Sequence, residues 1–269
     1  MKVEVLLSAM HLTDFSIVRR MNISSDILII NQTDHEGYQE ETIDGYKVRM
    51  YSTTQRGLSR SRNMALIHAS GDICLLADDD EVLADDYDKL ICSAFERLPK
   101  ASIIAFNVDQ ISKRSVKLRK PIMKDSLVNR FKTYSSWALA FKREDILRAG
   151  VYFNIMIGSG SGVISAGEET AWQHQARNVG LMQYEAPEII ATLLDGKSQW
   201  FKGYNEKYFY DLGANLTVNH PFLKHFLKYY FLWRLNKDTT LPKMKQLKYI
   251  NAGIKGFAKK LGYNDVYGQ

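Results

Sequence analysis

Short apolar runs alternate with amphipathic helical patterns through the first 110 residues of the chain. The runs at residues 3–8, 26–31, 47–52, 73–77 and 102–108 predict strands. The second run contains four consecutive Ile or Leu residues. It is too continuous for a strand with one solvent face and is typical of a parallel strand buried on both faces.

Helical patterns fill the gaps between these runs. Phe15, Val18 and Met21 are spaced as on one helix face, a second helix is predicted to begin after Gly57, and a third ends before Pro99. This order of strands and helices predicts an α/β fold, a doubly wound sheet with helices on both faces. Ligands of such sheets bind at the carboxyl ends of the strands. Ser8, Asn31 and Asp78 stand at three such ends, so we expect them to face one crevice.

Two basic amphipathic helices are predicted from about residue 216 onward. Aromatic residues recur at three-to-four spacing between residues 222 and 233, and lysines crowd one side of an apolar stripe between residues 241 and 261. Such helices suit an anionic membrane surface, here through residues 220–261, but they could also cover the body of the protein or form a homodimer contact. We therefore expect an α/β domain at 1–215 and a basic helical tail at 216–269.

The formal net charge of +6 is unevenly distributed. Residues 197–269 hold 13 Lys and Arg against 4 Asp and Glu, so this segment carries +9 and the first 196 residues carry −3. A one-sided positive charge favours an anionic partner. Recognisable RNA-binding and DNA-binding motifs are absent, so anionic lipid is expected rather than nucleic acid.

The cysteines and the N-terminus indicate where the protein works. Cys74 and Cys92 lie among apolar neighbours, which predicts buried free thiols rather than a disulfide. The apolar run after Met1 is short and includes Glu4, unlike a signal peptide. No uncharged apolar run approaches the ~18 residues that span a bilayer. We expect a cytoplasmic location, either free or peripheral at the inner face of the cell membrane.

Acidic residues gather where the fourth predicted strand ends, at Asp78-Asp79-Asp80-Glu81. Their mutual repulsion would be costly without a cation. Carboxylate oxygens suit Mg²⁺ or Mn²⁺, whose coordination is commonly completed by substrate phosphates. A solvated acidic turn before a helix is the alternative.

A basic segment precedes this cluster. Arg56, Arg60 and Arg62 surround the predicted start of a helix at Gly57. Guanidinium groups and a free helix N-terminus both attract phosphate.

Together these motifs resemble family 2 glycosyltransferases of the GT-A fold. The resemblance is carried by Gly57-Leu58-Ser59 with Arg62-Asn63, by Ala69-Ser70-Gly71-Asp72 and by Asp78-Asp79-Asp80, in the order and spacing of that family. It covers about residues 1–195 and implies that the domain at 1–215 is catalytic, with a donor half to about 110 and an acceptor half from about 111. It implies that Asp78 and Asp80 are the acids of the D-x-D motif, Asp80 ligating Mn²⁺ or Mg²⁺ and Asp78 lying nearer the ribose, with Asp79 as the variable middle position.

The resemblance also implies where the donor nucleotide binds. The stretch Ser8-Ala9-Met10 looks like the segment that cups the base. Asn31 stands where the family usually has an acid, and Asp34 is a nearby substitute.

A second acidic pair is similar to the family's G-E-D segment. In Gly167-Glu168-Glu169, the third position is that of the general base, which points to Glu169 and keeps Glu168 as a rival. Acids at a helix N-terminus also occur for structural reasons alone. Trp137 could stack on a sugar ring or pack in the core.

These roles predict an inverting, metal-dependent glycosyltransferase. It would move a sugar from a nucleotide-sugar donor, most simply a UDP-sugar, to a glycan acceptor that is lipid-linked, in the synthesis of a surface polysaccharide such as a capsule. One alternative is a sugar-phosphate nucleotidyltransferase, which would need a glycine-rich, Lys-bearing N-terminal loop where this chain has residues 8–12. The other is a catalytically silent, membrane-associated adaptor with the same fold.

Overall fold

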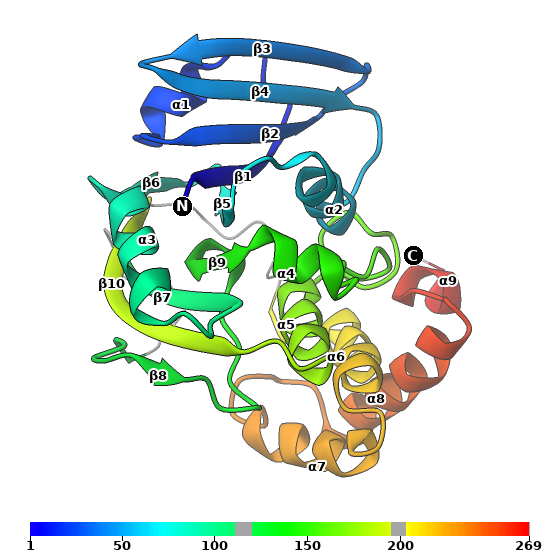
Figure 1. The fold of residues 1–269 in the computed structure, drawn as a ribbon. Helices are drawn as coiled ribbons and strands as arrows, with labels where there is room; N and C mark the ends of the chain where they lie inside the picture. The colour runs from blue at the N-terminus through cyan, green and yellow to red at the C-terminus, as the bar shows by residue number, and fades with distance from the viewer. Residues whose placement is uncertain (111–119, 195–202, 269) are drawn as a thin grey trace. The chain divides into compact units, whose positions relative to one another are not determined.

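The computed structural model describes residues 1–110, 120–194 and 203–268. A ten-stranded mixed sheet dominates this part of the chain, and the α/β fold expected from the sequence is confirmed (Figure 1). Its strands are β1 Val3–Met10, β2 Asp26–Gln32, β3 Gly37–Ile43, β4 Tyr46–Thr53, β5 Ile73–Asp78, β6 Glu81–Leu83, β7 Ile103–Gln110, β8 Ser126–Leu127, β9 Leu139–Lys142 and β10 Gln183–Leu193.

Helices connect most of these strands. They are α1 Ser16–Arg20, α2 Leu58–His68, α3 Tyr87–Arg97, the short 3-10 helix η1 Ser136–Ala138, α4 Arg143–Arg148, α5 Glu168–Asn178, α6 Glu206–Asn219, α7 Lys224–Arg234, α8 Lys243–Ala258 and α9 Tyr263–Tyr267. The expected strands and helices of the first 110 residues are all present, with ends shifted by a few residues.

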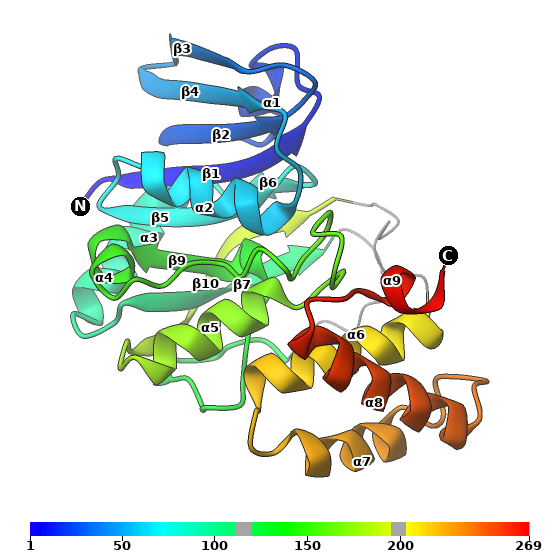
Figure 2. The ribbon, with the colours of Figure 1, turned by 90° about the vertical axis from the view of Figure 1, so that its right-hand side faces the viewer.

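The strand order is β3-β4-β2-β1-β5-β9-β7-β10-β6, and β8 pairs with β10. The neighbours β4, β2, β1 and β5 run parallel to one another, whereas β9 is antiparallel to both β5 and β7. Every residue of β2 is buried, as its unbroken apolar run predicts. In Figure 2, α2 lies in front of β1 and β5.

Strand β3 is absent from the sequence prediction because its residues are mostly polar. It pairs antiparallel with β4 through the two-residue turn Asp44-Gly45, whose φ angles are 52° and 89°. Two residues with positive φ form the hairpin turn that matches strand twist, and Asp-Gly favours it. The hairpin signal was therefore in the turn and not in the apolar pattern.

The chain forms two compact units, each with its own apolar core. The first contains Met1–Arg56, Arg60–Phe153 and Trp172–Lys197, and the sheet lies in it. The second contains Gly57–Ser59, Asn154–Ala171 and Ser198–Gln269, with α6 to α9. The boundary predicted after residue 215 falls inside α6, and the predicted division into catalytic domain and tail stays a prediction.

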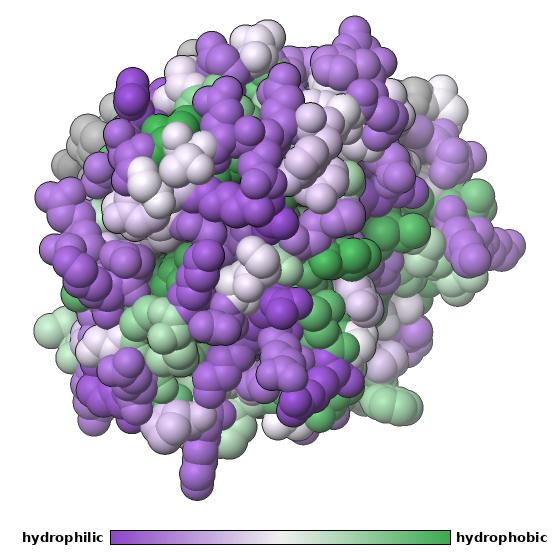
Figure 3. Space-filling model, turned by 45° about the horizontal axis from the view of Figure 1, so that its top comes forward, coloured by the Kyte–Doolittle hydropathy of each residue, from purple (hydrophilic) through white to green (hydrophobic). Residues whose placement is uncertain are grey.

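Two properties bear on the surface. Among the described residues, no helix is both long and apolar enough to cross a membrane. On the face of the molecule that Figure 3 shows, hydrophilic residues predominate and hydrophobic residues form small separate groups.

Candidate functional site

Three neighbouring parallel strands end together at one edge of the sheet. Ser8 of β1 is in register with Asp78 of β5, and Ala9 of β1 is in register with Asn31 of β2. All three strands run in the same direction, so these are carboxyl ends, where ligands of such sheets bind. Residues 8, 31 and 78, far apart in the sequence, are thus neighbours.

Asp78 is the centre of a charged cluster at this edge. Arg62 of α2 donates from Nη2 to Asp78 Oδ1 at 3.2 Å and to Ser136 Oγ at 2.7 Å. Ser136 Oγ in turn donates to Asp78 Oδ2 at 3.3 Å. The Arg62 side chain is 3% exposed and that of Asp78 is 30% exposed, so the carboxylate keeps a face toward solvent while the guanidinium supports it from behind.

The wall beside Asp78 is built by β1. Ser61 of α2 donates to Ser8 Oγ at 2.8 Å, which fixes α2 against the end of β1. Ala9 is buried, whereas Met10 is exposed. Of the Ser8-Ala9-Met10 stretch, Ser8 and Met10 therefore have surface available for a ligand.

Asn31 has a structural role in this geometry. Its side chain is fully buried, accepts from Leu12 N at 2.9 Å and donates to Leu12 O at 2.9 Å. A third bond runs to Ser52 Oγ at 3.3 Å. The amide holds the chain after β1 in place, and its predicted contact with a base stays a prediction. Asp34 is exposed and bonds to Thr33 and His35.

The turn after Asp78 concentrates negative charge. Glu81 is buried and accepts from Asp78 N at 2.5 Å, and its burial together with the charges of Asp78 and Asp80 raises its pKa well above the usual range. Partial burial and the carboxylates of Asp80 and Asp78 also raise the pKa of Asp79. The turn backbone is fixed because Asp79 O accepts from Arg20 and Asp80 O accepts from Leu194 N at 2.9 Å.

This donor set fits a metal that takes part of its coordination from a substrate. Consecutive carboxylates supply hard oxygen ligands. Burial first, and the neighbouring carboxylates of Asp80 and Asp78 second, raise the pKa of Asp79, and a divalent cation would relieve the repulsion between these carboxylates. Within the described ranges, no group of three or more His, Cys, Asp or Glu converges to enclose an ion. Mg²⁺ often binds through only one or two carboxylates plus substrate phosphates, so an open set is the expected form.

Glu168 and Glu169 begin α5 and lie in the second unit with the glycine loop at 158–162. Glu168 is 6% exposed, and a Cβ on Gly158 would approach its Oε2 to 3.2 Å. Gly158, with φ +110°, therefore lets Glu168 pack directly on the loop backbone. Glu169 is half-buried and more accessible. Both carboxylates belong to the first turn of α5.

Gly57 belongs to the same unit and packs against the same loop. A Cβ on Gly160 would lie 3.1 Å from Gly57 Cα, and Leu58 N donates to Ser159 O at 2.8 Å. Ser59 Oγ donates to Ile157 O at 2.5 Å. The role of Gly57 in donor binding stays a prediction, since what is observed is backbone packing.

Helix α6 holds the segment that leads into Glu168. Asp211 Oδ2 accepts from Ser165 N at 3.2 Å and pairs with Lys207 Nζ at 2.8 Å. Asn215 Nδ2 donates to Ala166 O at 2.9 Å. Asp211 and Asn215 are one turn apart on α6, so one face of this helix fixes the chain directly before the two glutamates.

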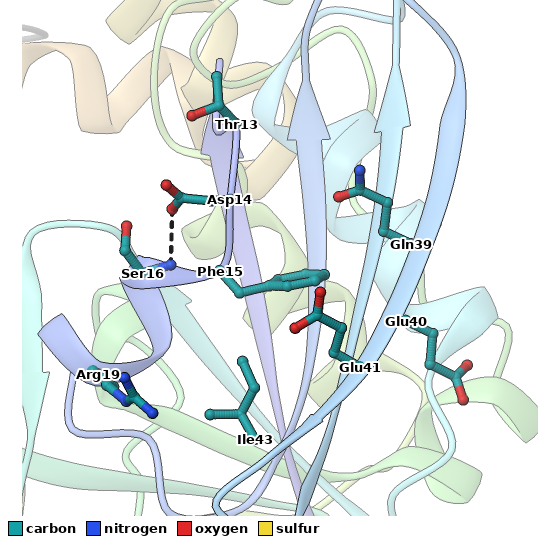
Figure 4. Close-up of a pocket in the computed structure, with 9 residues that line it drawn as sticks. All are labelled: Thr13, Asp14, Phe15, Ser16, Arg19, Gln39, Glu40, Glu41 and Ile43. Carbon is teal, nitrogen blue, oxygen red and sulfur yellow. Dashed lines mark hydrogen bonds between the residues drawn. The ribbon is translucent and has the colours of Figure 1, made fainter.

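Trp137 and the cavity between α1 and β3 are not part of the charged cluster. Trp137 is half-buried in η1 and packs against the core of the first unit, which favours the packing alternative. A cavity of about 620 Å³ opens between α1 and β3, lined by Phe15, Arg19 and Glu41 among others, and it contains none of the predicted site residues (Figure 4).

Two residues of the cluster were not predicted from the sequence. Ser136 and Ser61 reach the site only through tertiary contacts. Asn63, which the motif contains, bonds to both backbone groups of Phe153, at 2.9 Å and 2.7 Å. The Phe153 ring stacks on Trp172 and lies 5.5 Å from the Arg62 guanidinium carbon. The Arg62-Asn63 pair thus couples the charged cluster to the core.

Comparison with known proteins gives one family and one fold. A sequence model described as Glycosyl transferase family 2 matches residues 17–156, just over half of the chain. This segment contains Arg62, Asp78 and Ser136. A comparison with curated protein sequences gives no significant match.

Solved structures share the fold at low sequence identity. The crystal structure of residues 1–349 of TarS from S. aureus in complex with UDP-GlcNAc has a TM-score of 0.64 and 13% identity, covering 97% of this chain and 82% of that one. The same TarS fragment with UDP has a TM-score of 0.64 and 11% identity, covering 94% and 79%. GalNAc-T7 with UDP, GalNAc and Mn²⁺ has a TM-score of 0.58 and 14% identity, covering 98% and 57%. The likeness shows a GT-A type α/β fold.

Proposed function

The chain belongs to glycosyl transferase family 2, and on that premise we propose that it transfers a sugar from a UDP-sugar to a glycan acceptor with inversion at the anomeric carbon. The observation that carries the proposal is the Arg62–Asp78–Ser136 cluster at the carboxyl ends of β1 and β5. It places a supported, partly exposed carboxylate where α/β sheets bind nucleotides. The similar structures hold UDP, UDP-GlcNAc, or UDP with GalNAc and Mn²⁺, which supports the choice of nucleotide.

On this proposal the donor lies along the ends of β1 and β5. Asp78 accepts hydrogen bonds from the ribose, and Arg62 orients its carboxylate. Ser8 and Met10 border the base. Asp80, with Asp78, holds Mn²⁺ or Mg²⁺, and a bound ion would supply positive charge to the departing diphosphate.

The acceptor reaction needs one base. A carboxylate of Glu169 removes the proton of the acceptor hydroxyl as that oxygen forms a bond to the anomeric carbon, and the bond from that carbon to the diphosphate oxygen breaks. Attack from the face opposite the leaving group inverts the configuration. The accessibility of Glu169 and the burial of Glu168 favour Glu169 for this role. The α6 contacts to residues 165 and 166 would keep it in position.

Donor binding is the first test. The melting temperature of the protein should rise when a UDP-sugar is added with Mn²⁺. At a ligand concentration one hundred times Kd, the expected stabilisation is about 2.7 kcal/mol. Asp80→Ala should remove the metal-dependent part of the shift, and Asp238→Ala, an exposed acid in the second unit, should leave it unchanged. If no nucleotide sugar shifts the melting temperature in the presence of metal, the proposed function is wrong.

A further inference from the structure

Helix α7 has two opposite apolar faces, and the second unit buries only one of them. Leu232 and Leu235 are buried in the helical core, and Leu227 and Phe231 pack against it. The opposite face is aromatic and exposed. Its exposed fractions are 92% for Phe222, 75% for Phe226, 57% for Tyr229, 47% for Tyr230 and 75% for Trp233.

The spacing places the four residues of α7 on one stripe. Positions 226, 229, 230 and 233 follow the i, i+3, i+4, i+7 pattern of a single helix face. Single exposed apolar side chains need no explanation, but a contiguous aromatic stripe marks an interaction surface. Phe222 adds a fifth exposed aromatic ring in the turn just before α7 begins.

Among the residues of the second unit that the structure describes, the side chains of this face stay exposed. In Figures 1 and 2, α7 lies on the outside of α6 and α8. Its exposed stripe is therefore available to a partner as it stands, without any rearrangement of the helices.

Charge identifies the partner. Residues 220–261 contain ten Lys and Arg and a single acid, Asp238. Arg234 follows Trp233 directly, Lys237 lies four residues after Trp233, and both are exposed. Lys228 Nζ lies 5.1 Å from the centre of the Tyr229 ring. Exposed Trp and Tyr beside Lys and Arg are the residue types that settle at the headgroup level of a bilayer.

We propose that the aromatic face of α7 docks on the surface of an anionic lipid bilayer. A second copy of the chain would bring two strongly basic segments together, whereas an anionic headgroup layer neutralises them. Tyr and Trp rings then leave water while their polar atoms stay in the headgroup region. This inference stands apart from the proposed transferase activity, because the docking face uses none of the residues of the donor cluster.

Sedimentation with vesicles tests the proposal on the full chain. The protein should bind phosphatidylcholine vesicles containing phosphatidylglycerol, and more weakly as salt is raised. Phe226→Ala/Trp233→Ala should lower the partition coefficient about tenfold or more, since each ring loses much of its apolar burial. Arg234→Glu/Lys237→Glu should lower it about fivefold or more per base on anionic vesicles.

A matched control separates docking from general surface change. Ile67→Ala/Val179→Ala removes two exposed apolar side chains of the first unit, 60% and 53% exposed, and should leave vesicle binding unchanged. Melting curves of all variants should stay close to the parent because every substituted side chain is exposed. Asp80→Ala should bind vesicles normally, so loss of donor binding and loss of docking are distinguishable.

Two results would overturn the proposal. One is equal vesicle binding by the parent and by Phe226→Ala/Trp233→Ala. The other is a lipid-free dimer in analytical ultracentrifugation that the same double substitution converts to a monomer, which would assign the face to a second copy of the chain.

Discussion

Arg62 is an almost fully buried charge, and its partners determine what it can do. A buried guanidinium is tolerated only when its hydrogen bonds and its charge are compensated. Asp78 and Ser136 provide that compensation from β5 and η1. The Arg62 guanidinium therefore bonds to groups of the protein itself. It affects a ligand through the Asp78 carboxylate, which it orients.

Glu168 and Glu169 differ in burial, because Glu168 is buried and Glu169 is half-buried. Glu169→Gln removes the proposed base while keeping the shape of the side chain, so transfer should fall by about 10²- to 10⁴-fold, the usual contribution of a general base. Donor binding, followed by the melting shift with UDP-sugar and metal, should remain. The measurement is the initial rate of sugar transfer.

Glu168→Gln is the paired variant. It removes a buried charge packed on Gly158 and should have the smaller effect on the rate. Unchanged turnover in Glu169→Gln, with a large loss in Glu168→Gln, would assign the base to Glu168.

Helices α6 and α8 approach each other more closely than side chains with a Cβ permit. A Cβ on Gly213 would lie 2.1 Å from Ile250 O, and one on Gly253 would lie 1.9 Å from Tyr210 O. Both obstacles are backbone atoms, which cannot move aside without separating the helices. Glycine is thus required at this crossing although it is a poor helix former.

Gly253→Ala should destabilise the second unit. Helix propensity alone would favour Ala by about 1 kcal/mol, but overpacking against a backbone carbonyl costs about 1–3 kcal/mol or more. We expect a net loss, measured by urea denaturation followed by circular dichroism. Gly37→Ala is the control, because its Cβ would have only ordinary contacts at 3.8 Å and beyond, and it should be neutral or slightly stabilising. A Gly253→Ala protein as stable as the parent would mean that the crossing is looser than described.

At the scale of the whole molecule, contacts between distant parts of the chain decide the arrangement. Arg97 of α3 donates to both carboxylate oxygens of Asp125, at 2.7 Å and 3.0 Å, and to Glu188 of β10 at 2.8 Å. One side chain therefore joins three segments of the first unit. Its hydrogen bond and its charge hold the pKa of Asp125 below the usual value of 3.8.

The lowered pKa sets the direction of a pH dependence. Stability from an acid with a lowered folded pKa is present above its ordinary pKa and is lost as the pH falls through the folded value. Arg97→Met should therefore lower the free energy of unfolding by about 1 kcal/mol near pH 7, with a smaller difference below about pH 4. Urea denaturation across this range is the measurement.

Arg148→Met serves as its control. Arg148 pairs with Glu144 on the surface of α4, with both side chains more than two-thirds exposed, and such pairs contribute little. An equal loss in both variants, or a loss from Arg97→Met that does not change with pH, would contradict the network.

Apolar periodicity was enough to predict five strands of the first 110 residues and the α/β class. The run at residues 27–30 is typical of burial on both faces, and strands that alternate with helices are typical of a largely parallel sheet. The position of Asp78 at a strand end followed from the same pattern. The hairpin at Asp44-Gly45 also has a local sequence signal, which lies in the turn residues and not in the apolar pattern.

Only the tertiary structure could decide which polar side chains meet. Arg62 bonds to Ser136, which lies 74 residues later in the sequence. The side-chain amide of Asn31 bonds to the backbone of Leu12. Such contacts depend on how helices pack on the sheet, which no local pattern encodes. The sequence by itself determined that α7 is basic, aromatic and amphipathic. Which of its faces is buried was set by packing against α6 and α8, because both faces are apolar enough to enter a core.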